Sequence, residues 1–331
     1  MVAGEPLAGL ATFTVGRLAA RLSRGLAGFL LVALAGCVSL PQSDALREAP
    51  PQGLPSRVEL KDVPFHLQDD FLCGPATLAM VFNAAGVPAT VETLTPMVYL
   101  PGRQGSLQAE MLGATRRNGL VAYAPPQTLE GLLREVAAGT PAIVLLNLSL
   151  RWMPIWHYAV VIGYDLGERK VIVRSGKRSR EEWSFAFLEF FWQESGYWSM
   201  LALPPGRLPA AADEAGFTAA VAALEKAGRR DEAATAYRAS LERWPTSLVA
   251  LIGLGNVAYG RADLAGAEQA FRRATQAHPQ SGAAWNNLAH VLGELQRWAE
   301  AEAAARKAVA VGGPTRDAAE RTLAEILARQ R

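Results

Sequence analysis

A period of 34 residues runs through the C-terminal third of the chain and limits what this part can fold into. Three windows, starting at Glu214, Leu248 and Gly282, lie in register. The aligned positions are Phe217/Leu251/Trp285, Ala220/Leu254/Leu288, Ala233/Ala267/Ala301 and Tyr237/Phe271/Ala305, with Pro245, Pro279 and Pro314 near the window ends. Alanine-rich helical units of this length bury their apolar faces against neighbouring copies. Segment 214–331 is therefore predicted to stack helix pairs.

This register resembles that of tetratricopeptide repeats. The resemblance implies three repeats, a concave groove for peptides or partner proteins and a cap helix over residues 315–330. It does not identify the partner, and a purely stabilising role for the array stays open. Because a Pro-Pro-Gly step at Pro204 marks a boundary, we expect a linker at 204–213 and a separable helical array from Glu214 onward.

Composition excludes several classes of function. The length of 331 residues suggests about two domains with appendages. Half of the residues are hydrophobic, 19% are charged and the net charge is +2, which predicts a folded chain that is not a dedicated nucleic-acid binder. The sequence has no phosphate-binding loop, no dinucleotide fingerprint and no His–Cys cluster at metal-ligand spacing. We therefore expect neither a cofactor nor a metal.

The N-terminus resembles a bacterial lipoprotein signal. The uncharged stretch 25–36 has twelve residues, fewer than the roughly 20 that span a bilayer, and suits a signal-peptide core. The Leu-Ala-Gly-Cys motif that ends at Cys37 resembles a lipobox, which implies that 1–36 is removed and Cys37 acylated. An ordinary secretory signal is the alternative. By analogy, Val38 in place of a retention aspartate favours the outer membrane, facing the periplasm.

Cys73 is the other cysteine of the chain. With Cys37 acylated, it would have no intramolecular partner in an oxidising compartment. Gly74, Pro75 and a run of helix formers follow it, which predicts a thiol at the first turn of a helix. Unpaired N–H groups and the positive helix end favour a thiolate there. Cys73 is thus either a small buried apolar residue or a nucleophile.

Two further side chains suit a nucleophilic Cys73. Gln68, five residues upstream, can donate a hydrogen bond to the oxyanion that forms when a thiolate attacks a carbonyl. His157 begins a predicted strand over 156–164 and is suited to accept a proton near neutral pH. Two of the other histidines fall in the repeats and one lies beside Gln68, so elimination favours His157 as the base. A surface glutamine and a structural histidine are the alternatives.

These residues resemble the bacteriocin-processing family, the papain-like peptidases that cut double-glycine leader peptides. The likeness is carried by Gln68, the string Cys73-Gly74-Pro75-Ala76 and the string His157-Tyr158-Ala159-Val160-Val161. It covers 59–203 and implies an α+β papain-like fold, in which the helix with the cysteine packs against a sheet that carries the histidine. With the repeats, the expected architecture is an α+β domain followed by an all-α solenoid.

The sequence departs from the family at three places. Leu72 stands where the transporter-linked members usually carry an acidic residue, and Gln68 lies about one residue closer to the cysteine than usual. The Asp or Asn that orients the histidine is missing, because the chain has Val173-Arg174-Ser175-Gly176 in place of the family's Asp-Pro step.

Ser175 is the positional candidate for this third residue. If the two strands pair so that Tyr164 lies near Lys170, Ser175 falls almost opposite His157 on the same face. Asp165 lies about 26 Å from His157 along an extended strand, too far to orient it. A hydroxyl stabilises an imidazolium less than a carboxylate does. A backbone carbonyl, or no orienting group, is equally open.

The rest of the chain fits this plan. Segment 37–58, rich in Pro, Gln, Ser and Gly, is predicted to be a tether. The aromatic segment 181–203 is expected to close the domain with a helix and a last strand, mostly as core. Further helices are predicted at 109–118 and 129–138, and strands at 142–148 and 170–175.

Two functions from different classes follow. In the first, the chain is a lipid-anchored cysteine peptidase of the cell envelope whose repeats recruit a peptide or protein. In the second, the papain-like domain has lost turnover and the chain is a peptide-binding scaffold. The intact Gln, Cys and His favour the enzyme, and the missing acid favours the scaffold.

Overall fold

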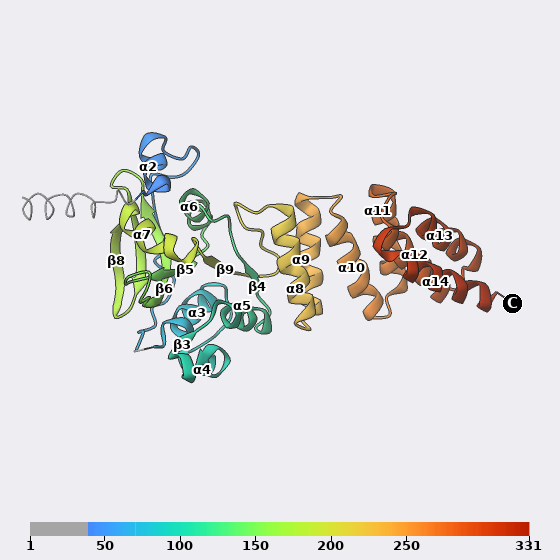
Figure 1. Ribbon diagram of the computed structural model, residues 1–331, viewed down its shortest axis with the longest axis horizontal. Coiled ribbons are helices and arrows are strands. Elements are labelled where there is room, and N and C mark those ends of the chain that lie inside the picture. The colour runs from blue at the N-terminus through green and yellow to red at the C-terminus, as the bar shows by residue number, and fades with distance from the viewer. Residues whose placement is uncertain (1–38, 70, 331) are drawn as a thin grey trace, which may run out of the picture. The chain divides into compact units, whose positions relative to one another are not determined.

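The computed structural model describes residues 39–69 and 71–330 (Figure 1). The predicted acylation site Cys37 lies outside these residues. Among the helices that the structure describes, none is long and apolar enough to cross a membrane.

A seven-stranded antiparallel sheet forms the centre of the N-terminal domain. Its main path runs β4-β9-β5-β6-β7-β8, and β1 pairs with the far end of β6. The strands are β1 (Arg57–Glu59), β4 (Val121–Tyr123), β5 (Ala142–Asn147), β6 (Trp156–Asp165), β7 (Lys170–Ser175), β8 (Arg178–Ser184) and β9 (Ser199–Leu203). A separate two-stranded sheet joins β2 (Tyr99–Leu100) to β3 (Gly105–Ser106), with the short helix η1 (Pro101–Arg103) between them.

Helices cover both faces of this sheet because its strands alternate two apolar sets of side chains. Ile143 and Val160 pack in one core with α3 (Cys73–Ala84), α4 (Val91–Val98) and α5 (Gln108–Arg117). Val144 and Val161, their neighbours along the same strands, pack in the other core with α6 (Leu129–Ala137) and α7 (Phe185–Trp192). The short helix η2 (Gln193–Ser195) continues from α7. The expected α+β architecture is confirmed.

The register between β6 and β7 differs slightly from the prediction. Lys170 pairs with Asp165, one residue beyond the expected Tyr164, and an irregularity between Val161 and Gly163 then absorbs one residue. Gly163 is required there, because a Cβ would lie 2.5 Å from the Val58 carbonyl oxygen of β1. Beyond this point Val160 pairs with Arg174, so Ser175 still faces the start of β6.

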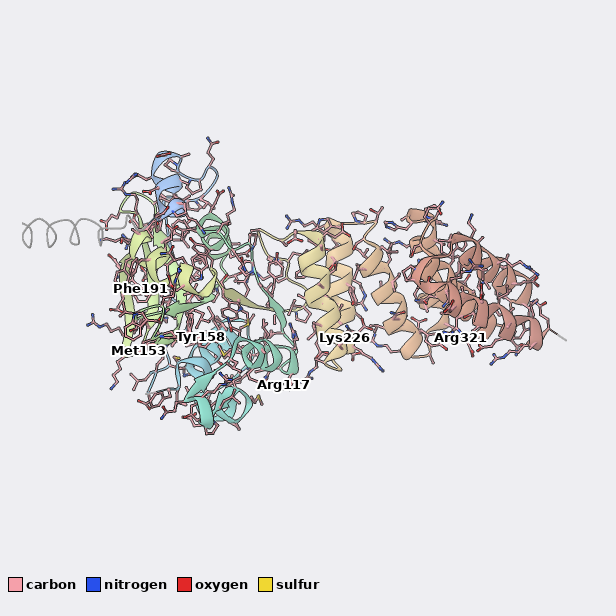
Figure 2. All side chains as sticks on the ribbon, in the orientation of Figure 1. Arg117, Met153, Tyr158, Phe191, Lys226 and Arg321 are labelled. Carbon is pink, nitrogen blue, oxygen red and sulfur yellow. The ribbon has the colours of Figure 1, made fainter. Side chains whose placement is uncertain are left out.

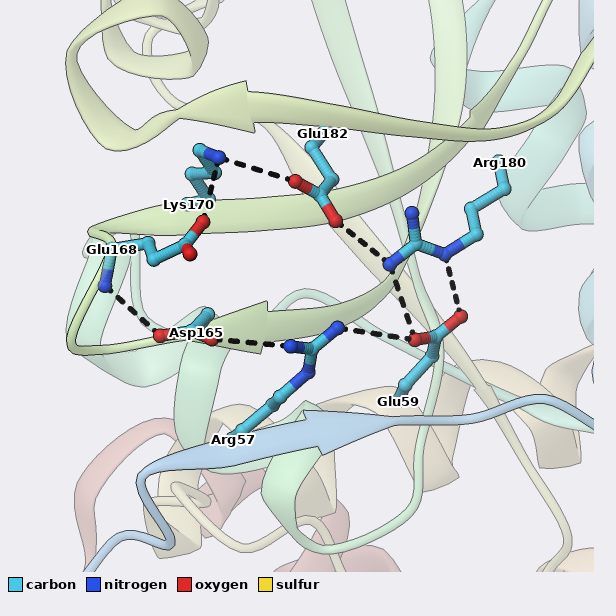
Figure 3. Close-up of polar contacts among 7 residues, drawn as sticks. All are labelled: Arg57, Glu59, Asp165, Glu168, Lys170, Arg180 and Glu182. Atoms are coloured by element: carbon cyan, nitrogen blue, oxygen red, sulfur yellow. Dashed lines mark hydrogen bonds and ion pairs between the residues drawn. The ribbon is translucent and has the colours of Figure 1, made fainter.

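Charged side chains connect the neighbouring strands β1, β6, β7 and β8 and the turn between β6 and β7 (Figure 3). Arg180 pairs with Glu59 at 2.9 Å and Arg57 with Asp165 at 3.5 Å. The full set consists of Arg57, Glu59, Asp165, Glu168, Lys170, Arg180 and Glu182. Exposed pairs of this kind contribute little to stability because water and salt screen them. They also account for Asp165, which has no part at His157.

The tether predicted over 37–58 is wrong for part of its length. Residues Pro41–Glu48 form the helix α2, and Leu46 is buried in the core. The N–H groups of Gln42 and Ser43 donate to the two carboxylate oxygens of Glu189 on α7, at 2.9 and 2.6 Å. This partner lies far along the chain, so composition alone gave no sign of the helix.

The C-terminal part consists of paired helices in the predicted order. They are α8 (Glu214–Lys226), α9 (Arg230–Arg243), α10 (Leu248–Gly260), α11 (Leu264–Ala277), α12 (Gly282–Glu294), α13 (Trp298–Val311), the short η3 (Gly313–Thr315) and the cap α14 (Arg316–Arg329). Glycines of α10 let the neighbouring helices α9 and α11 approach closely. A Cβ on Gly253 would lie 2.2 Å from the Tyr237 ring, and one on Gly255 would lie 2.4 Å from the Phe271 ring. The repeat positions are therefore packing positions.

The first repeat is not detached from the α+β domain. Tyr123 of β4 packs edge-on against Phe217 of α8, with ring centroids 5.9 Å apart, and both belong to one core. Glu135 of α6 is fully buried and accepts hydrogen bonds from the N–H groups of Ala210 and Ala211, at 3.0 and 2.8 Å. The linker expected at 204–213 is thus fixed in place, and an isolated array would expose the apolar face of α8.

Candidate active site

A cleft of about 680 Å³ lies beside the N-terminus of α3. Cys73, His157 and Gln68, predicted from separate parts of the sequence, all line it. The turn around β3 and the connection between β5 and β6 supply most of the remaining wall. The other lining residues are Asp69, Phe71, Arg103, Gln104, Gly105, Ser106, Leu107, Leu148, Pro154, Ile155, Trp156, Tyr158, Gly176 and Lys177.

Cys73 is the first residue of α3, as the sequence predicts. Its own N–H and that of Gly74 precede the first hydrogen bond of the helix, which joins the Ala76 N–H to the Leu72 carbonyl. Gly74 lets the β3 turn approach, since a Cβ there would lie 2.3 Å from Ser106 Oγ. The helix start and the turn thus enclose a half-buried thiol, the free cysteine of the described residues.

The resting charge state of Cys73 differs from the sequence-based expectation. Burial raises the pKa of the thiol above its ordinary value. Hydrogen bonds from the backbone of Tyr158, Gly74 and Cys73 itself oppose this rise but do not reverse it. The helix N-terminus does act in the predicted direction, yet desolvation outweighs it. Burial therefore favours the uncharged thiol over the thiolate that we had expected.

His157 begins β6, and its ring is also largely removed from water. Its Nε2 lies 2.9 Å from Ser175 Oγ, so the two residues that the sequence paired are in contact. Burial lowers the pKa of the His157 imidazole to about 4. Within residues 39–69 and 71–330, no carboxylate hydrogen-bonds to this ring. At neutral pH it is an uncharged base, and a resting thiolate–imidazolium pair is not favoured.

Gln68 is held so that its amide nitrogen is left available. The side chain is 5% exposed, and its Oε1 accepts a hydrogen bond from the Gly176 N–H at 2.9 Å. The Gln68 N–H donates in turn to the Gly176 carbonyl at 3.2 Å. Because Oε1 faces an N–H donor, the orientation of the amide is fixed. Its Nε2 is buried without a partner among the described residues, although it lies in a wall of the cleft.

The remaining histidines are occupied elsewhere. His66 contacts Asn83 at 3.0 Å, His278 contacts the Thr246 carbonyl at 2.6 Å and His290 contacts the Tyr259 hydroxyl at 2.9 Å. None of them lines the cleft. Nor does any group of three or more His, Cys, Asp or Glu residues in the described parts of the chain form a metal site.

Residues 60–200 match the model of the Peptidase_C39 like family. This segment is a C39-like peptidase domain. Residues 217–282 and 252–319 match the tetratricopeptide repeat, so the C39-like domain is followed by repeats of this type. The resemblance of 59–203 to the C39 family and that of the C-terminal part to tetratricopeptide repeats are confirmed.

Several solved structures are similar to parts of the chain. A structure described as a C39-like peptidase from Bacillus anthracis is 18% identical, with 45% of this chain and 98% of that chain covered and a TM-score of 0.38. YrrB, described as a tetratricopeptide-repeat protein with an unusual peptide-binding site, is 22% identical over 36% of this chain and 60% of its own, with a TM-score of 0.33. The first tetratricopeptide repeat of Spaghetti, solved with an HSP90 peptide, is 18% identical over 35% and 92%, also with a TM-score of 0.33. No curated protein matches the chain.

The C39-like site contains three residues that the sequence did not single out. Gly176 orients Gln68 through both of its backbone groups. Ser106 has a buried hydroxyl without a partner in the described structure, and its carbonyl accepts a hydrogen bond from the Tyr158 hydroxyl at 3.2 Å. Tyr158, labelled in Figure 2, also contacts the thiol through its backbone. Ser106 follows Gly105 in the glycine-rich stretch 101–108, which was the one available signal in the sequence.

Proposed function

We propose that the chain is a lipid-anchored cysteine peptidase of the bacterial cell envelope, with repeats that recruit a protein or peptide. One observation carries the catalytic part of this proposal. Cys73, His157 and Gln68 line a single cleft, although 84 residues separate Cys73 from His157 in the sequence. The Nε2 of Gln68 is buried there without a partner among the described residues. A nucleophile, a base and an oxyanion donor are the groups that acyl transfer needs.

The first step is attack on a peptide carbonyl. When His157 Nε2–H donates to Ser175 Oγ, Nδ1 carries a lone pair and can accept the Cys73 proton. The proton moves from sulfur to the imidazole as sulfur bonds to the carbonyl carbon. This proton transfer during attack suits the pair in the structure, because a buried uncharged thiol and a buried uncharged imidazole are its favoured resting forms.

Gln68 and the helix start then stabilise the oxyanion. The carbonyl oxygen gains negative charge as the tetrahedral intermediate forms, and Gln68 Nε2 and the Cys73 N–H are the proposed donors. The intermediate collapses when the C–N bond breaks and His157 returns its proton to the leaving amine. Water next attacks the thioester, again with His157 as base, and releases a carboxylate and the Cys73 thiol.

The lipid anchor and the location rest on the sequence. The Leu-Ala-Gly-Cys motif after a short apolar core supports acylation of Cys37 and attachment to the envelope, with the outer membrane facing the periplasm as the proposed site. Mass spectrometry of membrane fractions is expected to find a lipid-modified N-terminal Cys37. A soluble chain cleaved at another position would contradict the anchor without affecting the peptidase.

Peptide cleavage tests the catalytic proposal. The chain from residue 37 onward, with Cys37→Ser, is incubated with a proteome-derived peptide library, and new termini are identified by mass spectrometry. We expect the Cys73→Ala variant to lose all cleavage and the His157→Ala variant to lose most of it. If Cys73→Ala releases the same termini at the same rate, the chain is not a cysteine peptidase. Peptides retained by Cys73→Ala and never cut by the parent chain would support the scaffold instead.

A further inference from the structure

One connection of the C39-like domain exposes large apolar side chains in an unusual number. It joins β5 to β6, and we call residues 148–156 the apolar hairpin. Its exposed fractions are 77% for Trp152, 55% for Leu150 and Met153 and 58% for Ile155. Leu148 and Trp156 are also more than 40% exposed. Contiguous exposure of this kind marks a surface that binds something.

Specific hydrogen bonds fix the conformation of the apolar hairpin. Asn147 Oδ1 accepts hydrogen bonds from the N–H groups of Ser149 and Ile155, at 3.1 and 3.0 Å. A bridge between Leu150 and Met153 closes the turn at its tip. In Figure 2 the labelled Met153 lies at the outer edge of the domain. The fold thus holds the apolar tip out in water by specific polar contacts.

The cleft does not explain why the tip of the apolar hairpin is exposed. Leu148, Pro154, Ile155 and Trp156 line the cleft, whereas Leu150, Trp152 and Met153 do not. The base of the apolar hairpin therefore belongs to the site already described. Its three tip residues have no role there.

The helical segment formed by α7 and η2 contacts both the tip and the helix α2. Arg151 at the tip forms a two-pronged ion pair with Glu194 of η2, with both contacts at 2.9 Å. Five residues earlier, Glu189 of α7 holds the N–H groups of Gln42 and Ser43. These two attachment points are separated by about 8 Å at helical rise. Phe187 and Phe190 of the same helix are 45% and 43% exposed.

Two exposed cations and one exposed carboxylate, Asp69, lie on the cleft wall beside the apolar hairpin. Arg103 and Lys177 are exposed on the wall of the cleft that the hairpin shares. Aromatic and aliphatic side chains next to lysine and arginine are the combination that binds the headgroup region of a bilayer with anionic lipids.

We propose that the tip residues Leu150, Trp152 and Met153, together with Phe187 and Phe190, dock the domain on the bilayer surface. Cys37 lies five residues before Gln42, a length of chain that reaches at most about 18 Å. An acyl group on Cys37 would thus bring this end of the domain to the membrane. This orientation rests on the lipid anchor of the proposed function, but the docking surface binds without it. The mouth of the cleft then faces polypeptides at the membrane surface.

Vesicle co-sedimentation tests the surface in the absence of an acyl group. The chain from residue 37 onward carries Cys37→Ser and Cys73→Ala, so neither acylation nor turnover contributes. The probes are vesicles of phosphatidylethanolamine with phosphatidylglycerol, and vesicles of phosphatidylcholine alone. We expect binding to the anionic vesicles and weaker binding to the neutral ones. The double variant Trp152→Ser/Met153→Ser should lower the partition coefficient at least about tenfold.

A matched double variant controls for general loss of apolar surface. Met97→Ser/Val249→Ser removes two side chains that are 38% and 47% exposed and lie outside the proposed surface. It should bind vesicles like the parent chain, and circular dichroism should show both variants folded. The proposal is overturned if the parent chain ignores anionic vesicles or if the two double variants bind equally. If Trp152→Ser/Met153→Ser, placed in the chain with Cys73, keeps vesicle binding but loses peptide cleavage, the tip contacts substrate instead.

Discussion

The cleft and the junction between the C39-like domain and the repeats use similar side chains in opposite ways. At the junction, both carboxylate oxygens of Glu135 accept backbone hydrogen bonds, and the Tyr123 ring is enclosed by the core. In the cleft, Gln68 Nε2 and Ser106 Oγ are buried without partners in the described structure. Next to them stands an apolar hairpin with its tip in water.

This difference indicates that the junction serves packing and that the cleft serves binding. A buried polar atom without a partner costs roughly 1–3 kcal/mol, so a ligand that hydrogen-bonds to it gains binding free energy. Such atoms also occur elsewhere in the described structure, as at Tyr164 and Ser199, but these residues do not line the cleft. The junction has no such atom on Glu135, which is consistent with a purely structural role. The cleft has two, together with exposed apolar surface, which is consistent with a site that is completed by a peptide. Substitutions at the two regions should therefore change different measurements.

Among the substitutions that test this comparison, Gln68→Ala should have the largest effect, which is on kcat. Loss of one oxyanion donor lowers kcat on the order of 10²-fold to 10³-fold. Gln68→Glu is the matched variant, because it keeps an acceptor for the Gly176 N–H and removes the Nε2 donor. We expect both to lose activity to a similar extent while the melting temperature of Gln68→Glu stays near that of the parent chain. Full activity in Gln68→Glu would exclude Nε2 as the donor.

Glu135→Ala should affect stability and leave turnover unchanged. The substitution strands the N–H groups of Ala210 and Ala211 and should lower the free energy of unfolding by about 3 kcal/mol. Glu130→Ala, on the exposed side of the same helix, removes a carboxylate whose partner is Arg134 and should cost less than about 1 kcal/mol. Urea denaturation measures both. A kcat that falls with Glu135→Ala in the folded protein would couple the junction to the cleft.

The pH dependence of stability should report the burial of His157. Its pKa of about 4 in the folded chain lies below the value of about 6.5 for an unfolded histidine. Between these values the unfolded chain binds the extra proton, so stability rises with pH and is lost as pH falls from 6.5 towards 4. After allowance for partial exposure, the contribution is about 2 kcal/mol.

Thermal melts of the parent chain and of His157→Gln at pH 7 and pH 4.5 isolate this contribution. The parent chain should lose more stability on acidification than His157→Gln, since other titrating groups are common to both. Equal losses would mean that the imidazole is already hydrated and titrates normally. In that case the uncharged Cys73–His157 pair would no longer be supported.

Local signals explain which parts of the fold the sequence predicted. Gly74 and Pro75 after Cys73 fix the start of α3, and the aliphatic run before Asn147 fixes β5, because each depends on neighbouring residues. The helix α2 was missed because its N-terminus is held by Glu189, which lies 147 residues beyond Gln42. The irregularity near Gly163 was missed because a single inserted residue leaves no periodic trace.

The site likewise divides into features that local sequence predicts and features that depend on distant residues. Residue chemistry and elimination led to Cys73, His157 and Gln68, and strand pairing led to Ser175. The sequence did not predict that Gly176 orients Gln68, a contact across 108 residues. Nor did it predict the charge state of the thiol, because helix position is local whereas desolvation depends on everything that packs around Cys73.

Ser175→Ala should have the smallest effect on catalysis. Ser175→Asp is the variant that shows whether residue 175 acts on His157. The hydroxyl at 2.9 Å from His157 Nε2 can position the ring but carries no charge, so Ser175→Ala should lower kcat/KM less than about tenfold. A carboxylate at this position stabilises the imidazolium and should raise the pKa of His157 from about 4. The acid limb of the kcat/KM profile should therefore move to higher pH in Ser175→Asp, and alkylation of Cys73 by iodoacetamide near pH 7 should accelerate. An acid limb shared by the parent chain, Ser175→Ala and Ser175→Asp would mean that residue 175 does not act on His157 during turnover.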